Sequence, residues 1–340
     1  MRLSGSITIT CLICIQICVS VVIVIALGTR RVQNKTILAS GESHHLREDW
    51  EKGLDAEYKK MPNGHGRTRT RRINDADIDV VLENTQLCRG VSEVDVVFVV
   101  HSSADHYDRR QILRTIFQKQ KTHTNYTIRH VFLLGQRNDV KIQEIINQEF
   151  NQHGDIVQGR FQDSYRNLTY KAVTGLKWIS HNCRDVKYVI KMDDDVYVSL
   201  RMFFTYIYHQ YTGDNRVLCW SWKSSTVLVN RRGKWSIDKD DLRQYDLFPL
   251  DYCSGFAVVI PGAITPALYK ATRLVPYMWI DDYFLSGMAR AAVTKLHDLS
   301  PYHYYVIFPQ HRAACMKTIN LCKIIFSPNT KIRRLPVIMA

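Results

Sequence analysis

Short apolar runs alternate with segments of helical periodicity through the middle of the chain. Runs that are rich in β-branched and aromatic residues and bounded by turn-forming residues predict buried strands. The predicted strands are 94–100, 129–134 and 187–192. Apolar residues at helical spacing predict helices that begin near Asp108 and cover about 142–150 and 168–179. Strands that alternate with helices predict an α/β sheet covered on both faces.

The N-terminal region predicts a membrane anchor. Residues 7–27 read ITITCLICIQICVSVVIVIAL and include no charged side chain. The run has the length needed to cross a bilayer, is longer than the apolar region of a cleaved signal peptide, and is not followed by a convincing cleavage site. We therefore expect a retained signal-anchor helix. The predicted organisation is a short cytoplasmic tail at 1–6, the transmembrane helix at 7–27, a polar and basic stem at 28–72 and a folded domain at 73–340.

The charges that flank this helix favour one orientation, whereas the cysteines and the glycosylation patterns favour the other. Arg30, Arg31 and Lys35 follow the span, whereas only Arg2 and the amino terminus precede it, so the positive-inside rule favours a cytoplasmic domain. Six cysteines outside the span are compatible with up to three disulfides and with an oxidising lumen, although the sequence does not say which of them pair. Acceptor patterns for N-glycosylation also favour a lumenal domain, at Asn34, Asn125 and Asn167.

The net charge of +14 is concentrated at the two ends of the chain. Residues 1–72 hold 12 basic and 6 acidic residues, and residues 301–340 hold 6 basic residues and no acidic one. The part between them is nearly neutral, with 28 basic and 26 acidic residues. This distribution argues against a nucleic-acid-binding domain. The chain also lacks a basic patch with interleaved aromatic residues, which such a domain would need.

Three consecutive carboxylates, Asp193-Asp194-Asp195, directly follow the predicted strand at 187–192. Ligands of open α/β sheets bind beyond the carboxyl ends of strands, and hard oxygen ligands suit Mg²⁺ or Mn²⁺. An acidic surface turn is the alternative interpretation. A second pair, Asp281-Asp282, precedes a helical run and by itself would be read as an N-cap.

The residues around these carboxylates resemble the β-1,3-galactosyltransferase family, which includes β-1,3-N-acetylglucosaminyltransferases. The resemblance covers about residues 94–290. Its specific motifs are FQDSYRNLTYK at 161–171, KW at 177–178 and YVIKMDDDVYV at 188–198. Weaker matches are RRQILR at 109–114, GDIVQ at 154–158, KW at 234–235, FPLDYCSG at 248–255 and IDD at 280–282.

The resemblance implies a GT-A fold, a Rossmann-like mixed sheet flanked by helices, that binds a UDP-sugar through a divalent metal, Mn²⁺ or Mg²⁺. Asp195 would be the likeliest direct metal ligand, with Asp193 nearer the nucleotide and able to share the ion. Asp282 would be the general base that deprotonates the acceptor hydroxyl in one inverting displacement. His311 is a further candidate metal ligand. The candidate neighbours of the nucleotide and its diphosphate are Asp163, Asp193, Asp194, Lys171, Arg110 and Arg114.

Members of the family resemble single-span type II Golgi membrane proteins, which implies a lumenal domain against the count of flanking charges. We expect transfer of galactose from UDP-galactose to a glycan acceptor on a glycoprotein or glycolipid, in β-1,3 linkage. Transfer of N-acetylglucosamine from UDP-GlcNAc is the alternative. A non-catalytic, lectin-like member is a more distant one. Ile116-Phe117, Phe256-Ala257 and Tyr283 depart from the family pattern, which leaves donor and acceptor selectivity open.

Overall fold

The computed structural model describes residues 71–308, 311 and 323–329. The predicted tail, transmembrane helix and nearly all of the stem therefore lie outside the described residues, as does Asn34. Within the described ranges no helix is both long enough and apolar enough to cross a membrane.

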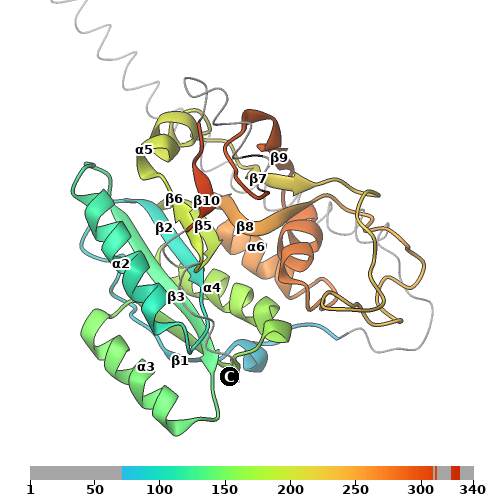
Figure 1. The fold of residues 1–340 in the computed structure, drawn as a ribbon, viewed down its shortest axis with the longest axis horizontal. Coiled ribbons are helices and arrows are strands. Elements are labelled where there is room, and N and C mark those ends of the chain that lie inside the picture. Colours follow the sequence, from blue (N-terminus) through green and yellow to red (C-terminus); the bar gives the residue numbers. More distant parts are fainter. Residues whose placement is uncertain (1–70, 309–310, 312–322, 330–340) are drawn as a thin grey trace, which may run out of the picture. The chain divides into compact units, whose positions relative to one another are not determined.

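A mixed sheet of eight strands forms the centre of the domain, in the order β1-β4-β3-β2-β5-β8-β7-β9 (Figure 1). Strand β2 pairs in parallel with β3 and with β5, whereas β8 runs antiparallel to both β5 and β7. The predicted strands lie in β2, β3 and β5, so the expected mixed α/β sheet is confirmed. The strands are β1 (Val80–Leu82), β2 (Val94–His101), β3 (Ile128–Gln136), β4 (Ile156–Gln162), β5 (Val186–Asp193), β7 (Val217–Trp222), β8 (Tyr252–Pro261) and β9 (Leu296–Asp298).

Helices cover both faces of this sheet, as the alternating pattern predicts. On one face, Phe117 of α2 stacks on Phe98 of β2 with ring centroids 4.7 Å apart. On the other face, α4 approaches so closely that a Cβ on its Gly175 would lie 2.5 Å from Leu133 and 3.0 Å from Val99. The helices are α2 (Tyr107–Lys121), α3 (Val140–His153), α4 (Leu168–Asn182), α5 (Leu200–Phe203) and α6 (Thr265–Thr272). Two π-helices span Phe204–Tyr208 and Tyr283–Ala289, and short 3₁₀ turns span Asp75–Ile78, Tyr165–Asn167, Gly262–Ile264 and Ser300–Tyr302.

The Asp triplet lies at the carboxyl edge of the parallel strands. Strands β2 and β5 are in a register that places His101 beside Asp193. Beyond the triplet, strand β6 (Val196–Val198) pairs with β10 (Phe326–Pro328) in a separate two-stranded sheet. The backbone N–H of Asn329 then donates to the carbonyl of Asp195 at 2.7 Å. A distant part of the chain thus fixes the loop that carries the triplet.

Two disulfides join segments that are distant along the chain. Cys88–Cys183 connects the segment before β2 to the end of α4, and Cys219–Cys253 connects the neighbouring strands β7 and β8. These four residues are among the six cysteines expected to be available for pairing. The other two, Cys315 and Cys322, lie outside the described residues.

Buried ion pairs connect the helices on the first face. Arg110 is fully buried and donates to both carboxylate oxygens of Glu149, at 2.9 and 2.7 Å. Arg114 lies 2.7 Å from the same carboxylate and forms two hydrogen bonds to Asp155, at 2.8 and 2.7 Å. Glu149 therefore joins α3 to two arginines of α2, and its carboxylate balances charge that the interior cannot solvate.

Replacing Glu149 with alanine should destabilise the domain strongly. The change leaves the buried Arg110 guanidinium without its carboxylate, and breaking a buried pair in this way costs about 3–5 kcal/mol. Chemical denaturation would measure the loss in the free energy of unfolding. Glu144→Ala, an exposed position on the same helix, is the matched control and should change stability by less than about 0.5 kcal/mol. Equal losses of stability in Glu149→Ala and Glu144→Ala would contradict the conclusion that the buried ion pairs of Glu149 stabilise the domain.

Candidate active site

The ammonium group of Lys191 lies at the centre of the candidate site. Lys191 is on β5, two residues before the Asp triplet, and its side chain is 5% exposed. Its Nζ lies 2.8 Å from Oδ2 of Asp281 and 3.2 Å from Oδ1 of Asp282. Asp281 is buried, whereas 30% of the Asp282 side chain remains exposed. The lysine thus holds one carboxylate in the interior and presents the other to solvent.

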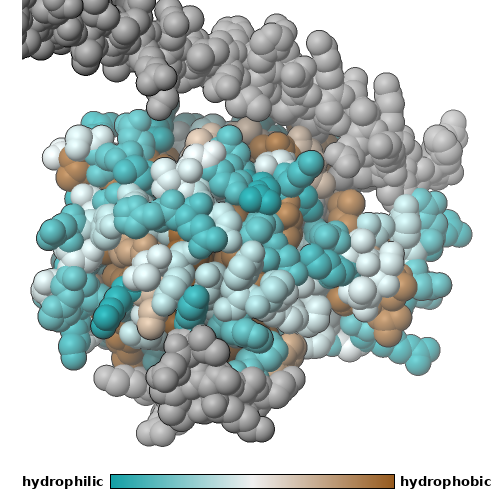
Figure 2. All heavy atoms as spheres, turned by 90° about the horizontal axis from the view of Figure 1, so that it is seen from above, coloured by the Kyte–Doolittle hydropathy of each residue, from teal (hydrophilic) through white to brown (hydrophobic). Residues whose placement is uncertain are grey.

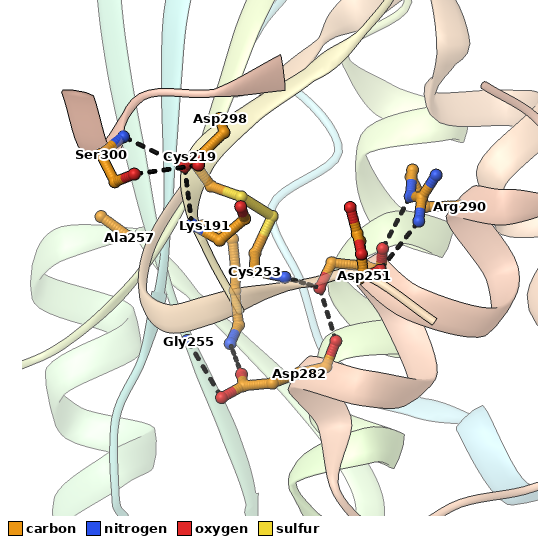
Figure 3. Close-up of a disulfide and its surroundings, with 12 residues drawn as sticks. Lys191, Cys219, Asp251, Cys253, Gly255, Ala257, Asp282, Arg290, Asp298 and Ser300 are labelled. Carbon is orange, nitrogen blue, oxygen red and sulfur yellow. Dashed lines mark hydrogen bonds and ion pairs between the residues drawn. A yellow bond between two sulfur atoms is a disulfide. The ribbon is translucent and has the colours of Figure 1, made fainter. Parts of the chain in front are cut away.

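A glycine on β8 holds the second oxygen of Asp282. The backbone N–H of Gly255 donates to Oδ2 of Asp282 at 3.0 Å, and Figure 3 shows Gly255 and Lys191 converging on this carboxylate. A Cβ at position 255 would lie only 2.1 Å from Oδ1 of Asp282. The site therefore requires glycine here because the carboxylate occupies the space of a side chain.

The backbone of Asp282 is fixed to the same strand. Ser286, one turn further along, donates its hydroxyl to the carbonyl of Asp282 at 2.6 Å. The N–H of Cys253 donates to the same Ser286 hydroxyl at 2.8 Å, and the Cys219–Cys253 disulfide joins that strand to β7 (Figure 3). Asp282 therefore has its backbone and both side-chain oxygens held in place, which limits its motion relative to β5 and β8.

The surroundings of Asp282 make it a weaker acid than an ordinary aspartate. Burial and the negative charge of Asp281 raise the pKa of Asp282 to about 6, although Lys191 and the Gly255 N–H oppose the rise. Burial disfavours the charged form of Lys191, but the carboxylates of Asp281 and Asp282 more than compensate and raise its pKa. Asp282 is thus a carboxylate that is ionised at neutral pH and can accept a proton there.

The first aspartate of the triplet belongs to the same cluster of charges. Burial raises the pKa of Asp193 well above its usual range, and the negative charges of Asp282, Asp281 and Asp195 add to the rise. His101, beside Asp193 in the sheet, has its Nδ1 3.7 Å from Asp281. Burial and the nearby lysines lower the pKa of His101, so its ring is neutral at physiological pH. Asp193, Asp281 and Asp282 thus interact electrostatically at this edge of the sheet, and Lys191 offsets part of their repulsion.

The second aspartate has a different environment. Asp194 is buried, and it accepts hydrogen bonds from Ser102 at 2.8 Å and from Arg109 at 2.8 Å. Its Oδ2 also lies 2.7 Å from Nδ1 of His106. Burial by itself would raise the pKa of Asp194, but His106 and Arg109 lower it below its ordinary value. These contacts anchor the triplet to the loop after β2 and to α2.

The other predicted neighbours of the diphosphate are bonded within the protein. Lys171 and Asp163 form a buried ion pair at 2.9 Å, and Asp163 also accepts from the N–H of Gly135 at 2.8 Å. Arg110 and Arg114 bind Glu149 and Asp155, as described above. The predicted contacts of these four residues with a diphosphate remain predictions.

The remaining predicted positions are His311, Asn125 and Asn167. The ring of His311 contacts Phe308, with centroids 5.3 Å apart, and Trp220, at 6.2 Å. Asn125 is exposed between α2 and β3. Asn167 is half-buried and donates to the carbonyl of Gln162 at 2.9 Å. The predicted roles of His311 in metal binding and of the asparagines in glycosylation remain predictions.

The donor chemistry fits a divalent cation that is shared with a phosphate ligand. Within 71–308, 311 and 323–329 no three His, Cys, Asp or Glu side chains are grouped closely enough to hold a metal ion. Mg²⁺, however, is commonly bound through one or two carboxylates together with water and substrate phosphates. Asp193 and Asp195, which supply hard oxygen donors one residue apart from each other on either side of Asp194, fit that arrangement.

Lys191, Gly255 and Ser286 are among the residues of the site to which the sequence assigned no role. Lys191 has a detectable signal, because a lysine inside the apolar strand YVIKM needs a buried partner. Gly255 could be noticed only as a glycine inside a strand, which often marks a close approach. Ser286 has no signal beyond its spacing of four residues from Asp282.

Three curated relatives are similar to this chain. Beta-1,3-galactosyltransferase 5 of Pan paniscus is 27% identical over 205 residues, which are 60% of this chain and 67% of that protein. Beta-1,3-galactosyltransferase 1 of Mus musculus is 24% identical over 221 residues, 65% of this chain and 67% of that protein. The acetylgalactosaminyl-O-glycosyl-glycoprotein beta-1,3-N-acetylglucosaminyltransferase of Homo sapiens is 26% identical over 204 residues, 58% of this chain and 53% of that protein.

The family model described as Galactosyltransferase matches residues 108–300. This match covers more than half of the 340 residues and includes both the Asp triplet and Asp282.

Replacing Lys191 with methionine should raise the pKa of Asp282 above its present value of about 6. The substitution removes the positive charge that opposes repulsion between Asp281 and Asp282, and like carboxylates in one site push a pKa upward. Carboxyl ¹³C chemical shifts recorded against pH would measure the change. Lys187→Met, on the same strand but paired with Glu93, is the control and should leave the pKa of Asp282 in place. A lower pKa in Lys191→Met would refute this electrostatic account.

Proposed function

Because the chain belongs to the galactosyltransferase family and is a hexosyltransferase, we propose that it transfers a sugar from a UDP-sugar to a hydroxyl group of a glycan acceptor. The observation that carries the proposal is the geometry of Asp282. Its carboxylate is held by Lys191 and the Gly255 N–H, remains partly exposed, and has a pKa raised to about 6. A base with a pKa near the working pH is the group that this transfer needs.

In the proposed reaction, Asp282 accepts the proton of the acceptor hydroxyl. The acceptor oxygen forms a bond to the anomeric carbon of the donor, and the bond from that carbon to the diphosphate breaks. A single displacement inverts an α-linked donor into a β-linked product and needs no covalent intermediate with the protein. Lys191 keeps the carboxylate ionised until the hydroxyl arrives, since its positive charge favours the unprotonated form.

The proposal also includes the type of fold and the residues that would hold a metal ion. We assign the mixed sheet to the GT-A type, with the nucleotide at the carboxyl edge near Asp193 and Asp195. These two residues would hold Mn²⁺ or Mg²⁺, which when bound neutralises charge on the diphosphate leaving group. Asp194 would act indirectly, because its bonds to Ser102, Arg109 and His106 fix the loop on which its two neighbours stand.

The donor that we favour is UDP-galactose, with a β-1,3-linked product. UDP-GlcNAc is the second candidate, since the Homo sapiens relative is a β-1,3-N-acetylglucosaminyltransferase by name. The two donors differ at C2 and C4 of the sugar, so discrimination depends on contacts of the pocket with those positions.

We also propose that the domain is lumenal in the Golgi and is anchored by a helix at 7–27 as a type II membrane protein. The Cys88–Cys183 and Cys219–Cys253 disulfides support an oxidising compartment. The exposed Asn125 is accessible for glycosylation there.

The direct test is to incubate the full-length chain with Mn²⁺, UDP-galactose or UDP-GlcNAc, and methyl β-glycoside acceptors. We expect transfer from one donor and loss of turnover in excess chelator. Asp282→Asn should lower kcat by roughly 10²–10⁴-fold, the contribution usual for a general base, while UDP still binds. Asp240→Asn, which changes an exposed carboxylate, is the control.

Each result has a defined consequence. Full activity of Asp282→Asn would refute the base assignment, and unchanged turnover with chelator would refute the metal assignment. If neither donor is transferred or hydrolysed, a lectin-like protein becomes the better interpretation.

Transfer should also depend on pH through Asp282. The base is active only when ionised, and its pKa is raised to about 6, so kcat/KM should fall on the acid side of about pH 6 and level off above it. The fall should approach tenfold per pH unit well below the midpoint, and initial rates between pH 5 and 8 would measure it. A flat profile from pH 5 to 7 would contradict a role for Asp282 as the base.

A further inference from the structure

Three aromatic side chains from separate segments meet beside the candidate active site. They are Tyr165 after β4, Trp235 in the loop between β7 and β8, and Trp279 just before Asp281, and we call them the aromatic platform. Tyr165 is 44% exposed and Trp235 is 55% exposed. Most of the one face shown in Figure 2 is polar, and apolar residues appear there only in small separate patches. Tyr165 and Trp235 contact each other, so they form an exposed aromatic patch and are not isolated surface residues.

Hydrogen bonds and stacking hold the platform in place. The indole N–H of Trp235 donates to the hydroxyl oxygen of Tyr165 at 2.9 Å. The indole N–H of Trp279 donates to the carbonyl of Ser236 at 3.1 Å, and the guanidinium of Arg166 donates to the same carbonyl at 2.9 Å. Arg166 also stacks on Trp279, with its central carbon 3.9 Å from the ring centroid. The rings are therefore pre-organised although two of them are exposed.

The chain places the aromatic platform close to Asp282. Trp279 is three residues before Asp282 in the chain. Burial raises the pKa of Tyr165, the hydrogen bond from Trp235 opposes the rise, and the negative charges of Asp282, Asp281 and Asp193 add to it. The ring centroids of Tyr165 and Trp279 are 6.0 Å apart. Through Trp279, the platform is thus attached to the short segment that carries the proposed base.

We propose that the aromatic platform binds the acceptor sugar, an inference that rests on the proposed function. Sugar rings have an apolar C–H face and a polar rim, and a site with exposed aromatic faces and a few fixed polar groups suits that chemistry. The acceptor must bring a hydroxyl to Asp282, whereas the nucleotide belongs with Asp193 and Asp195. The position of the platform beside Asp282 therefore favours the acceptor over the nucleoside. Lys234, 4.6 Å from the Tyr165 ring, supplies a donor at the edge of the platform.

The test compares Trp235→Ala and Trp235→Phe with the unaltered full-length chain. Methyl β-galactoside and methyl N-acetyl-β-glucosaminide are the acceptors, since they carry no aromatic group that could stack by itself. Trp235→Ala should raise the acceptor KM about tenfold, as expected for the loss of an aromatic contact, while Trp235→Phe keeps a ring and should recover most of the affinity. The donor KM, and donor hydrolysis without acceptor, should not change.

A matched control separates this effect from general damage. Tyr302→Ala removes an aromatic ring of similar exposure, 41%, outside the platform and should leave all kinetic constants unchanged. Thermal unfolding of each variant would show whether the fold is intact.

The outcomes also separate the inference from the proposed function. An unchanged acceptor KM in Trp235→Ala would overturn the platform while leaving the transferase proposal in place. A raised donor KM with an unchanged acceptor KM would assign the rings to the nucleotide and overturn the inference. If the unaltered chain transfers no sugar, the proposed function fails, and saturation-transfer NMR with the same methyl glycosides then tests the platform directly. Binding that Trp235→Ala abolishes would support it, and binding that this variant keeps would refute it.

Discussion

The candidate site depends on the ion pairs that Lys191 forms with Asp281 and Asp282. Removing an ammonium group from water is costly, and β5 tolerates this lysine because two carboxylates lie within 3.2 Å of its Nζ. The two carboxylates depend on the lysine in turn. Without it, they would repel each other and one would remain protonated. The ionised state of Asp282 at neutral pH, and its orientation, both follow from this arrangement. The arrangement therefore depends on keeping these three groups at fixed positions.

Rigid elements hold them there. Lys191 is on a strand in the interior of the sheet, and Gly255 is on its antiparallel neighbour, so the positions of cation and N–H donor are set by strand pairing. Ser286 and the Cys219–Cys253 disulfide then connect the segment of Asp282 to β8 and β7. A catalytic group supported in this way loses little freedom when a ligand binds, which is the general advantage of a pre-organised site.

The sequence predicted the strands and helices of the domain better than the contacts between its side chains. Apolar periodicity predicted β2, β3 and β5 and the helices between them, because burial dictates those patterns locally. Asp282 was found only through the resemblance, since two aspartates before a helix also match an N-cap. The pairing of Arg110 with Glu149, and of Arg114 with Asp155, was not predictable, because each joins residues about 40 positions apart. The contacts of Lys191 were not predictable for the same reason, because its partners lie about 90 positions further along the chain.

The pairing of β6 with β10 has a consequence for biosynthesis. The strand that follows the Asp triplet finds its partner about 130 residues later, and Asn329 then bonds the carbonyl of Asp195. Translation at 5–20 residues per second delays that partner by on the order of ten seconds. The central sheet can form during this interval, and Ser102, His106 and Arg109 are already available to bind Asp194. The contacts of β10 with β6 and of Asn329 with Asp195 can form only after the ribosome releases that later segment. During synthesis, the residues of the central sheet are therefore available before the residues that complete the surroundings of the triplet.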